Sequence, residues 1–134
     1  MAETIHFALV SPSSKLADAQ AEAVTVPAVE GDLTAMANHA PFLSALRPGV
    51  ITVTGGDKPG RYVVTGGFVE ILPTEVGVLA EDAAPAEAVD QAWIDERIDA
   101  AEKAIEALGE DDERRPAAMQ ALADLRFLPQ LLSV

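Results

Sequence analysis

The sequence predicts a mostly β fold with added α structure: an N-terminal antiparallel β-sandwich, or flattened barrel, followed by a C-terminal antiparallel two-helix hairpin. Eight of the nine glycines lie at or before Gly77, and six of the nine prolines divide the same stretch into short segments, which is typical of many short strands. Beyond residue 84, β-branched residues and glycine become rare, and Ala, Glu, Asp and Arg dominate. We therefore expect a β-sandwich domain over residues 1–84 and a helical hairpin, a candidate regulatory arm, over residues 85–134.

Alternating apolar residues predict the individual strands. Residues 5–9 alternate in this way, and Val24 and Val26 flank Thr25. Two hairpins follow, residues 50–54 with 61–65 around Gly55-Gly56-Asp57, and residues 68–72 with 76–80 around Pro73-Thr74-Glu75.

Two helical patterns follow the sandwich. The first has an apolar face at steps of four and three, made by Ile94, Ile98, Ala101, Ile105 and Leu108, and we expect it to end at Gly109 in a left-handed conformation. Acidic residues 110–113 can cap the second helix, which tolerates Pro116 in its first turn and ends or kinks at Pro129. Its apolar stripe consists of Ala118, Met119, Leu122, Leu125 and Leu128. The short link predicts an antiparallel hairpin.

Composition limits the partners. The 22 acidic against 9 basic side chains give a net charge of -13, which repels nucleic-acid phosphates and anionic lipid head groups. The absence of cysteine excludes disulfides, thiolate catalysis and Cys-ligated metal centres. No apolar run approaches the roughly 20 residues that span a bilayer, and the first residues do not resemble a signal peptide, so we expect no direct membrane insertion and a bacterial cytoplasmic setting.

No motif for catalysis, metal binding or cofactor binding stands out. The glycine pairs at 55–56 and 66–67 lack the strand-to-helix context of a phosphate-binding loop and are expected in turns. His6 and His39 belong to no metal-ligand pattern, and His39, beside Pro41, is expected to hydrogen-bond its own turn. The only tryptophan, Trp93, is expected to be a core or docking contact. We therefore predict no catalytic residue, no metal site and no cofactor.

One stretch carries a family resemblance. Between Val24 and Val50 the chain contains Glu-Gly-Asp-Leu at residues 30–33 and His-Ala-Pro-Phe-Leu at residues 39–43; Gly-Gly-Phe-Val-Glu at residues 66–70 and Val-Leu-Ala-Glu at residues 78–81 follow in order. This set resembles the epsilon-subunit family of F-type ATP synthases, whose mitochondrial counterpart is delta. The resemblance covers most of the β part and is weaker over the last forty or so residues.

The resemblance implies a rotor subunit without catalytic activity. In that family the sandwich binds the gamma subunit and the c-ring, so that ring rotation drives ATP synthesis in the alpha-beta hexamer, and the helices regulate ATP hydrolysis and can contact alpha and beta. It also implies a peripheral position on the cytoplasmic face of the bacterial inner membrane. The residues that fall at the family's c-ring contact are Glu30, Gly31, Asp32, His39, Ala40 and Pro41.

The family's ATP-binding motif, Ile/Leu-Asp-x-x-Arg-Ala, is degenerate in this chain. Val89 and Asp90 take the first two places, but Trp93 and Ile94 stand where Arg and Ala are expected. The positions of two further arginines in the second helix hold Gln120 and Asp124. Since these replacements remove the cationic donors for a triphosphate, we predict weak or no nucleotide binding.

Two other functions remain open at this stage. A small cupin-like enzyme would use His39 with nearby carboxylates, and stoichiometric metal in the purified protein would favour it. A free-standing β-sandwich adaptor would not co-purify with gamma. The sequence leaves open the resting position of the hairpin and the strength with which it inhibits ATP hydrolysis.

Overall fold

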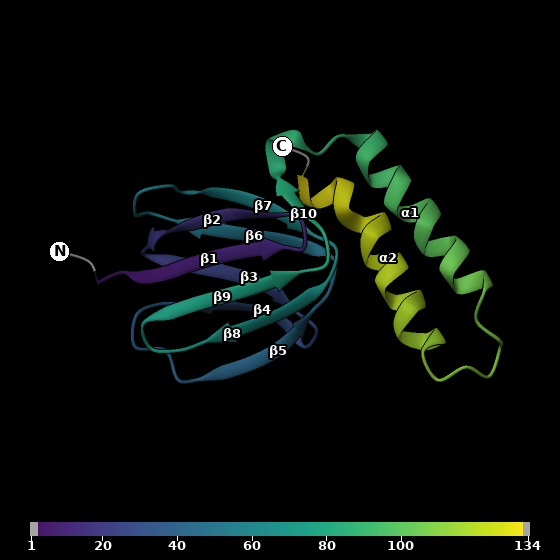
Figure 1. The fold of residues 1–134 in the computed structure, drawn as a ribbon, viewed down its shortest axis with the longest axis horizontal. Helices are drawn as coiled ribbons and strands as arrows, with labels where there is room; N and C mark the ends of the chain where they lie inside the picture. Colours follow the sequence, from purple (N-terminus) through teal and green to yellow (C-terminus); the bar gives the residue numbers. More distant parts are fainter. Residues whose placement is uncertain (1–2, 133–134) are drawn as a thin grey trace.

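The computed structural model describes residues 3–132 and contains a two-layered β-sandwich with a helical hairpin at one end (Figure 1). Ten strands form one continuous curved sheet. They are β1 (Ile5–Ser11), β2 (Ser14–Ala21), β3 (Ala23–Ala28), β4 (Gly31–Ala35), β5 (Phe42–Leu46), β6 (Gly49–Thr54), β7 (Gly60–Val64), β8 (Gly67–Ile71), β9 (Glu75–Ala80) and β10 (Ala83–Pro85). The short 3-10 helix η1 (Ala86–Ala88) then leads to α1 (Gln91–Glu106) and α2 (Arg115–Leu132).

The strand order confirms the predicted sandwich. It runs β10-β7-β6-β3-β5-β8-β9-β1-β2, with β4 paired to β3. The two layers join where Ala28 of β3 pairs with Leu46 of β5. Every pair is antiparallel except β1 with β9, which is parallel. Because β1 and β9 are far apart in the sequence, local periodicity could not predict that pair.

Both predicted hairpins are present, as β6–β7 and β8–β9. The sequence did not single out β2, β4, β5 or β10 as strands. In β2 the inward positions are small alanines that alternate with polar residues, which is a weak apolar signal. β4 and β5 overlap the acidic motif at residues 30–33 and the histidine motif at residues 39–43, and each is only five residues long. The pairing of β4 with β3 and of β5 with β8 makes them strands.

The sandwich core is built from aliphatic side chains. Alternate residues of β1 (Ile5, Phe7 and Leu9) are fully buried between the layers. Their neighbours come mainly from β3, β6, β8 and β9 and are mostly Val and Ile. With few aromatics available, one ring pair contributes, Phe7 with Tyr62 at 6.2 Å between centroids.

Both helices form, but their ends differ from the predicted ones. α1 ends at Glu106, and Ala107 follows it in a right-handed conformation. Gly109 has no positive φ, so its expected left-handed role is wrong. Pro116 lies in the first turn of α2 as expected, whereas α2 continues through Pro129 to Leu132, so the expected end at Pro129 is also wrong. Leu125 and Leu128 before Pro129 and Leu132 after it pack in one apolar cluster, which favours a continuous helix.

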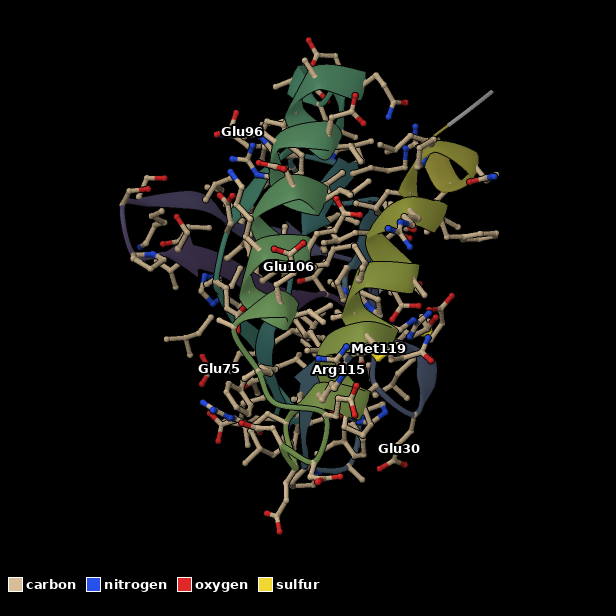
Figure 2. All side chains as sticks on the ribbon, turned by 90° about the vertical axis from the view of Figure 1, so that its right-hand side faces the viewer. Glu30, Glu75, Glu96, Glu106, Arg115 and Met119 are labelled. Atoms are coloured by element: carbon tan, nitrogen blue, oxygen red, sulfur yellow. The ribbon has the colours of Figure 1, made fainter. Side chains whose placement is uncertain are left out.

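The hairpin is docked on the sandwich. Ile94 of α1 and Leu125 and Leu128 of α2 are buried together with Val63, which β7 directs outward. The polar face of α1 is turned away from this contact, and Figure 2 shows Glu96 and Glu106 on that outer face. The resting position that the sequence left open is therefore the docked one in this structure.

Candidate functional site

The acidic motif lies on the β3–β4 hairpin, at the end of the sandwich that carries the helices. Val29 and Glu30 form its tip, and Gly31, the first residue of β4, adopts a φ of +140°, which favours glycine. Asp32 is the second residue of β4, and its carboxylate accepts a 2.5 Å hydrogen bond from Nη2 of Arg47. The turn is close to α2, since Val29 and Ala117 line the same hollow.

The histidine motif lies at the opposite end of β4. Asn38 donates its N–H to the Pro73 carbonyl at 2.8 Å and its side-chain amide to Glu3 at 2.8 Å, which places this loop beside the β8–β9 turn and the start of the chain. His39 Nδ1 donates to the carbonyl of Ala40 at 2.6 Å, which confirms the expected bond within its own turn. Figure 1 shows that β1 begins at the end of the sandwich that faces away from the helices.

The structure therefore splits the six predicted c-ring residues into two groups. Glu30, Gly31 and Asp32 form one group, and the segment 39–41 forms the other. The two groups lie at opposite ends of β4, whose five residues span about 13 Å at a strand rise of about 3.3 Å per residue.

A surface that the sequence analysis missed lies on the outer face of the second layer. Phe68 of β8 pairs with Leu79 of β9, and Leu79 pairs with Val10 of β1. Phe68 and Leu79 are 59% and 67% exposed, and Leu43 of β5, on the same face, is 69% exposed. We call these four residues the apolar row. The sequence did carry a signal for this surface. Phe68 and Leu79 are apolar, although the alternation of β8 and β9 directs their side chains outward.

A second exposed apolar stripe lies on α2. Met119, Ala123, Phe127 and Leu131 recur every four residues and are all exposed, although Leu122, Leu125 and Leu128 of the same helix are buried. We call the four exposed residues the α2 ridge; Figure 2 shows Met119 near the start of the helix. Because the other apolar stripe of α2 is buried in the protein, the α2 ridge is the one that can contact a partner.

Comparison with known proteins identifies the family. The family model described as "ATP synthase, Delta/Epsilon chain, beta-sandwich domain" matches residues 4–86. The chain belongs to the ATP synthase delta/epsilon family. It is 41% identical to an ATP synthase epsilon chain of Sinorhizobium medicae over 98% of both chains, and 44% identical to one of Mesorhizobium japonicum over 96% of this chain and 95% of that one. A chain of the Euglena gracilis mitochondrial ATP synthase (OSCP/F1/c-ring, rotational state 1) matches with a TM-score of 0.70 and 25% identity, over 97% of this chain and 82% of that chain.

The residues of the degenerate nucleotide motif have structural roles in this delta/epsilon chain. Asp90 caps α1, because its carboxylate accepts the Trp93 N–H at 2.8 Å. Val89, Trp93 and Ile94 pack in the cluster between the hairpin and the sandwich, so Trp93 is the core contact that the sequence predicted. These positions serve docking of the hairpin.

A hollow of about 430 Å³ lies between the sandwich and α2, large enough for a small ligand. Gln120 and Asp124 line it and hydrogen-bond to each other at 3.2 Å, and Glu81 adds a second carboxylate. Among the described residues that line it, Arg47 is the one cation, and it is paired with Asp32. The negatively charged lining of the hollow therefore disfavours binding of a triphosphate.

Calorimetric titration of the folded chain with ATP is expected to show no saturable heat, because two carboxylates, Glu81 and Asp124, line the hollow and its arginine is already paired. Titration of Asp124→Arg serves as the comparison, since that substitution removes one carboxylate and adds a donor. Tight, saturable heat with the unaltered chain would contradict the prediction.

The docked hairpin is held by Arg97. Its Nε donates to Asp82 at 2.7 Å, its Nη1 donates to the Trp93 carbonyl at 3.1 Å, and its guanidinium lies 3.7 Å from the centroid of the Trp93 ring. Asp82 belongs to the segment between β9 and β10, so this cluster ties α1 to the sandwich. We call Arg97, Trp93 and Asp82 the arginine clasp.

Arg97→Ala is expected to loosen the hairpin by about 1–2 kcal/mol, the sum of one partly exposed ion pair and one cation–π contact. Hydrogen exchange of the α1 amides should then be about five- to thirtyfold faster, with little change in β1 or β9. Lys103→Ala is the control, because Lys103 makes only an exposed pair with Asp99 on the same helix. Equal exchange rates in the two variants would refute the clasp.

No three His, Asp or Glu side chains of residues 3–132 cluster as metal ligands. His6 of β1 instead pairs with Asp18 of β2, and Lys15 donates to the other oxygen of Asp18 at 2.7 Å. The Lys15 hydrogen bond, followed by that from His6, lowers the pKa of Asp18 from 3.8 to about 2.

This lowered pKa has a consequence for stability. A carboxyl with a depressed folded-state pKa stabilises the fold above its unfolded value of 3.8, and the effect is lost as the pH falls through about 2. Between about pH 4 and pH 2, the thermal stability of Asp18→Asn should therefore fall less steeply than that of the unaltered chain. Asp57→Asn, an exposed turn substitution, should leave that slope as it is in the unaltered chain. An unchanged slope in Asp18→Asn would contradict the assignment.

Proposed function

We propose that this chain is a central-stalk rotor subunit of a proton-translocating F-type ATP synthase. It couples rotation of the c-ring, through gamma, to ATP synthesis in the catalytic hexamer, and it carries no catalytic site of its own. Family membership supports the complex, and the match to a chain of an ATP synthase structure that contains F1 and a c-ring supports the setting. The observation that carries the coupling role is the apolar row on a closed, densely packed sandwich.

The apolar row is the surface that gamma covers in this proposal. Its members come from four adjacent strands and are fixed by the sheet, so they lose little conformational freedom when a partner binds. Exposed aromatic and leucine side chains on a rigid face are typical of a stable protein interface. A rigid contact suits a subunit that transmits torque, because a close-packed body deforms little under load.

The acidic group on the β3–β4 hairpin and the histidine group after β4 are the two proposed contacts with the c-ring. The end with Glu30, Gly31 and Asp32 meets one polar loop of the ring, and the end with His39, Ala40 and Pro41 meets a different loop or the foot of gamma. The negative charge of the first group suits a cationic side chain on the loop.

The helical hairpin is the proposed regulatory arm. Its docked position is held by the arginine clasp, and its α2 ridge remains available to the alpha and beta subunits. The relatives at 41% and 44% identity are bacterial chains, which supports a place on the cytoplasmic face of the inner membrane, reached through partners. Neither α1 nor α2 combines the length and apolar content that a membrane span requires.

Co-expression with a gamma subunit and a c-ring tests the proposal. We expect a stable ternary complex that survives affinity capture through gamma and size-exclusion chromatography. Failure to co-purify with gamma would leave a free-standing adaptor as the better account. Stoichiometric metal together with turnover of a small molecule by the isolated chain would favour an enzyme instead.

A further inference from the structure

A second hollow, of about 210 Å³, lies between the outer face of the layer that contains β3, β6 and β7 and the last turn of α2. Nη1 of Arg61 donates to the Leu131 carbonyl at 3.3 Å, which ties β7 to that turn, and Figure 1 shows the end of α2 beside β7. We call this space the arginine hollow; the lining residues that matter are Thr25, Asp32, Arg47, Thr52, Arg61 and Leu131.

Hydroxyl groups and a guanidinium lie next to each other on the floor of the arginine hollow. Thr25 of β3 pairs with Thr52 of β6, and Thr52 pairs with Arg61 of β7. Both threonines face outward, because their neighbours along each strand are buried in the sandwich core. Directly paired residues have Cβ atoms about 5 Å apart, so Thr52 is within reach of the same bound group as Arg61.

The lining of the arginine hollow carries an excess of positive charge. Arg47 and Arg61 face one carboxylate, Asp32, which is already paired with Arg47. Within residues 3–132 no ion pair involves Arg61. The larger hollow beside α2 has the opposite balance, with Arg47 against Glu81 and Asp124. On a chain with a net charge of -13, the arginine hollow is therefore a local attractor for anions.

The donors of the arginine hollow suit an oxyanion. Guanidinium groups match the geometry of phosphate oxygens, and threonine hydroxyls donate to the same kind of acceptor. Thr25 and Thr34 share a hydroxyl hydrogen bond of 2.8 Å. When Thr34 donates in that bond, the proton of Thr25 is available to a ligand.

The volume of the arginine hollow limits the size of the ligand. Pockets that enclose drug-sized molecules measure roughly 300–1,000 Å³, and this one is smaller. It fits a small ion and does not enclose a nucleotide. The net charge of the chain repels an anionic membrane surface, which favours a free ion over a lipid head group.

We propose that the arginine hollow binds a small oxyanion of the inorganic phosphate type. Arg61 supplies the main charge, Thr25 and Thr52 donate hydroxyl hydrogen bonds, and Arg47 adds a second guanidinium while it stays bonded to Asp32. Because the hollow exists only while α2 is docked, the bound ion stabilises the docked helix. This inference is independent of the proposed rotor function, since it concerns the isolated chain.

Titration of the isotope-labelled chain with inorganic phosphate, followed by NMR at constant ionic strength, tests the site. We expect saturable shifts at the amides of Thr52 and Arg61. Arg61→Gln should weaken binding about tenfold, the loss of a charged donor, and Thr52→Val about two- to fivefold. Lys58→Gln is the control, because it makes the same charge change at an exposed position of the β6–β7 turn. Shifts that do not saturate, or equal affinities of Arg61→Gln and Lys58→Gln, would overturn the proposal.

Asp32→Asn gives a test of opposite sign. It removes the one carboxylate of the arginine hollow and releases a donor of Arg47, so phosphate should bind about two- to fivefold more tightly. A loss of local structure alone would weaken binding instead. An unchanged or lower affinity in Asp32→Asn would contradict the charge assignment.

Hydrogen exchange tests the link to α2. Phosphate should slow exchange of the amides in the last turn of α2 in the unaltered chain and leave them unchanged in Arg61→Gln. The same slowing in both variants would show that the ion acts elsewhere. Failure of phosphate to bind would refute this site and leave the rotor proposal intact, whereas failure of the chain to associate with gamma would leave the site intact.

Discussion

Leu79→Asp is expected to fold normally and to lose stable association with gamma. The side chain is 67% exposed and lies outside the core, so the fold does not depend on it. In the proposed interface, however, it lies at the centre of the apolar row, between Phe68 and Val10. A buried, unpaired carboxylate at such a position costs more than the lost apolar contact alone. We expect affinity for gamma to fall by about thirtyfold or more, the loss typical of a central interface residue.

Affinity capture through gamma, followed by a titration of the purified chain, measures this loss. Thr54→Asp is the matched control, since it places the same charge on an exposed strand position of the other layer. Circular dichroism and thermal unfolding should show that both variants fold alike. Retention of the Leu79→Asp chain on gamma, at the level of Thr54→Asp, would remove the apolar row from the interface.

Gly67→Ala is expected to destabilise the sandwich by about 2–4 kcal/mol. Gly67 adopts a φ of +131°, a conformation that other residues rarely adopt. A Cβ at this position would lie 2.1 Å from the Leu79 carbonyl oxygen and 2.8 Å from the Ala80 Cα, both of which are backbone atoms of the paired strand β9. Since backbone cannot move aside as a flexible side chain can, the β8–β9 pairing itself must shift.

Thermal and urea unfolding would detect this change as a fall in Tm of about 10 °C. Gly77→Ala is the control on the same hairpin, because a Cβ there meets no atom within 4 Å and its φ is not positive. It should change stability by less than about 0.5 kcal/mol. Equal stabilities of the two variants would show that the close approach at Gly67 is not a constraint.

The local patterns of the sequence were sufficient for the elements with strong periodicity. The alternation in β1, β6, β7, β8 and β9 and the apolar steps of α1 and α2 each predicted an element that the structure contains. Their signals are local, because strand and helix periods follow from the backbone geometry of neighbouring residues. The helix ends were less well predicted, since Gly109 and Pro129 act only as tendencies that packing can override.

The arrangement of the candidate site residues, in contrast, depends on the tertiary structure and not on local patterns. Residues 30–32 and 39–41 are close in the sequence, and the resemblance treats them as one contact. The intervening segment becomes β4, an extended strand, so the two groups lie at opposite ends of the sandwich. The partner of Asp32 was likewise hidden, because Arg47 is 15 positions away and reaches it only after β5 turns into β6.

By itself the sequence determined the class of fold and a family resemblance, which the structure and the comparisons confirmed. Each of these depends on local composition, periodicity or the order of short motifs. Only the tertiary structure decided which side chains face outward together, as in the apolar row, and which charges are already paired, as with Asp32 and Arg47. The physical reason is that strand pairing joins residues from distant parts of the chain, and the properties of a surface arise from that pairing.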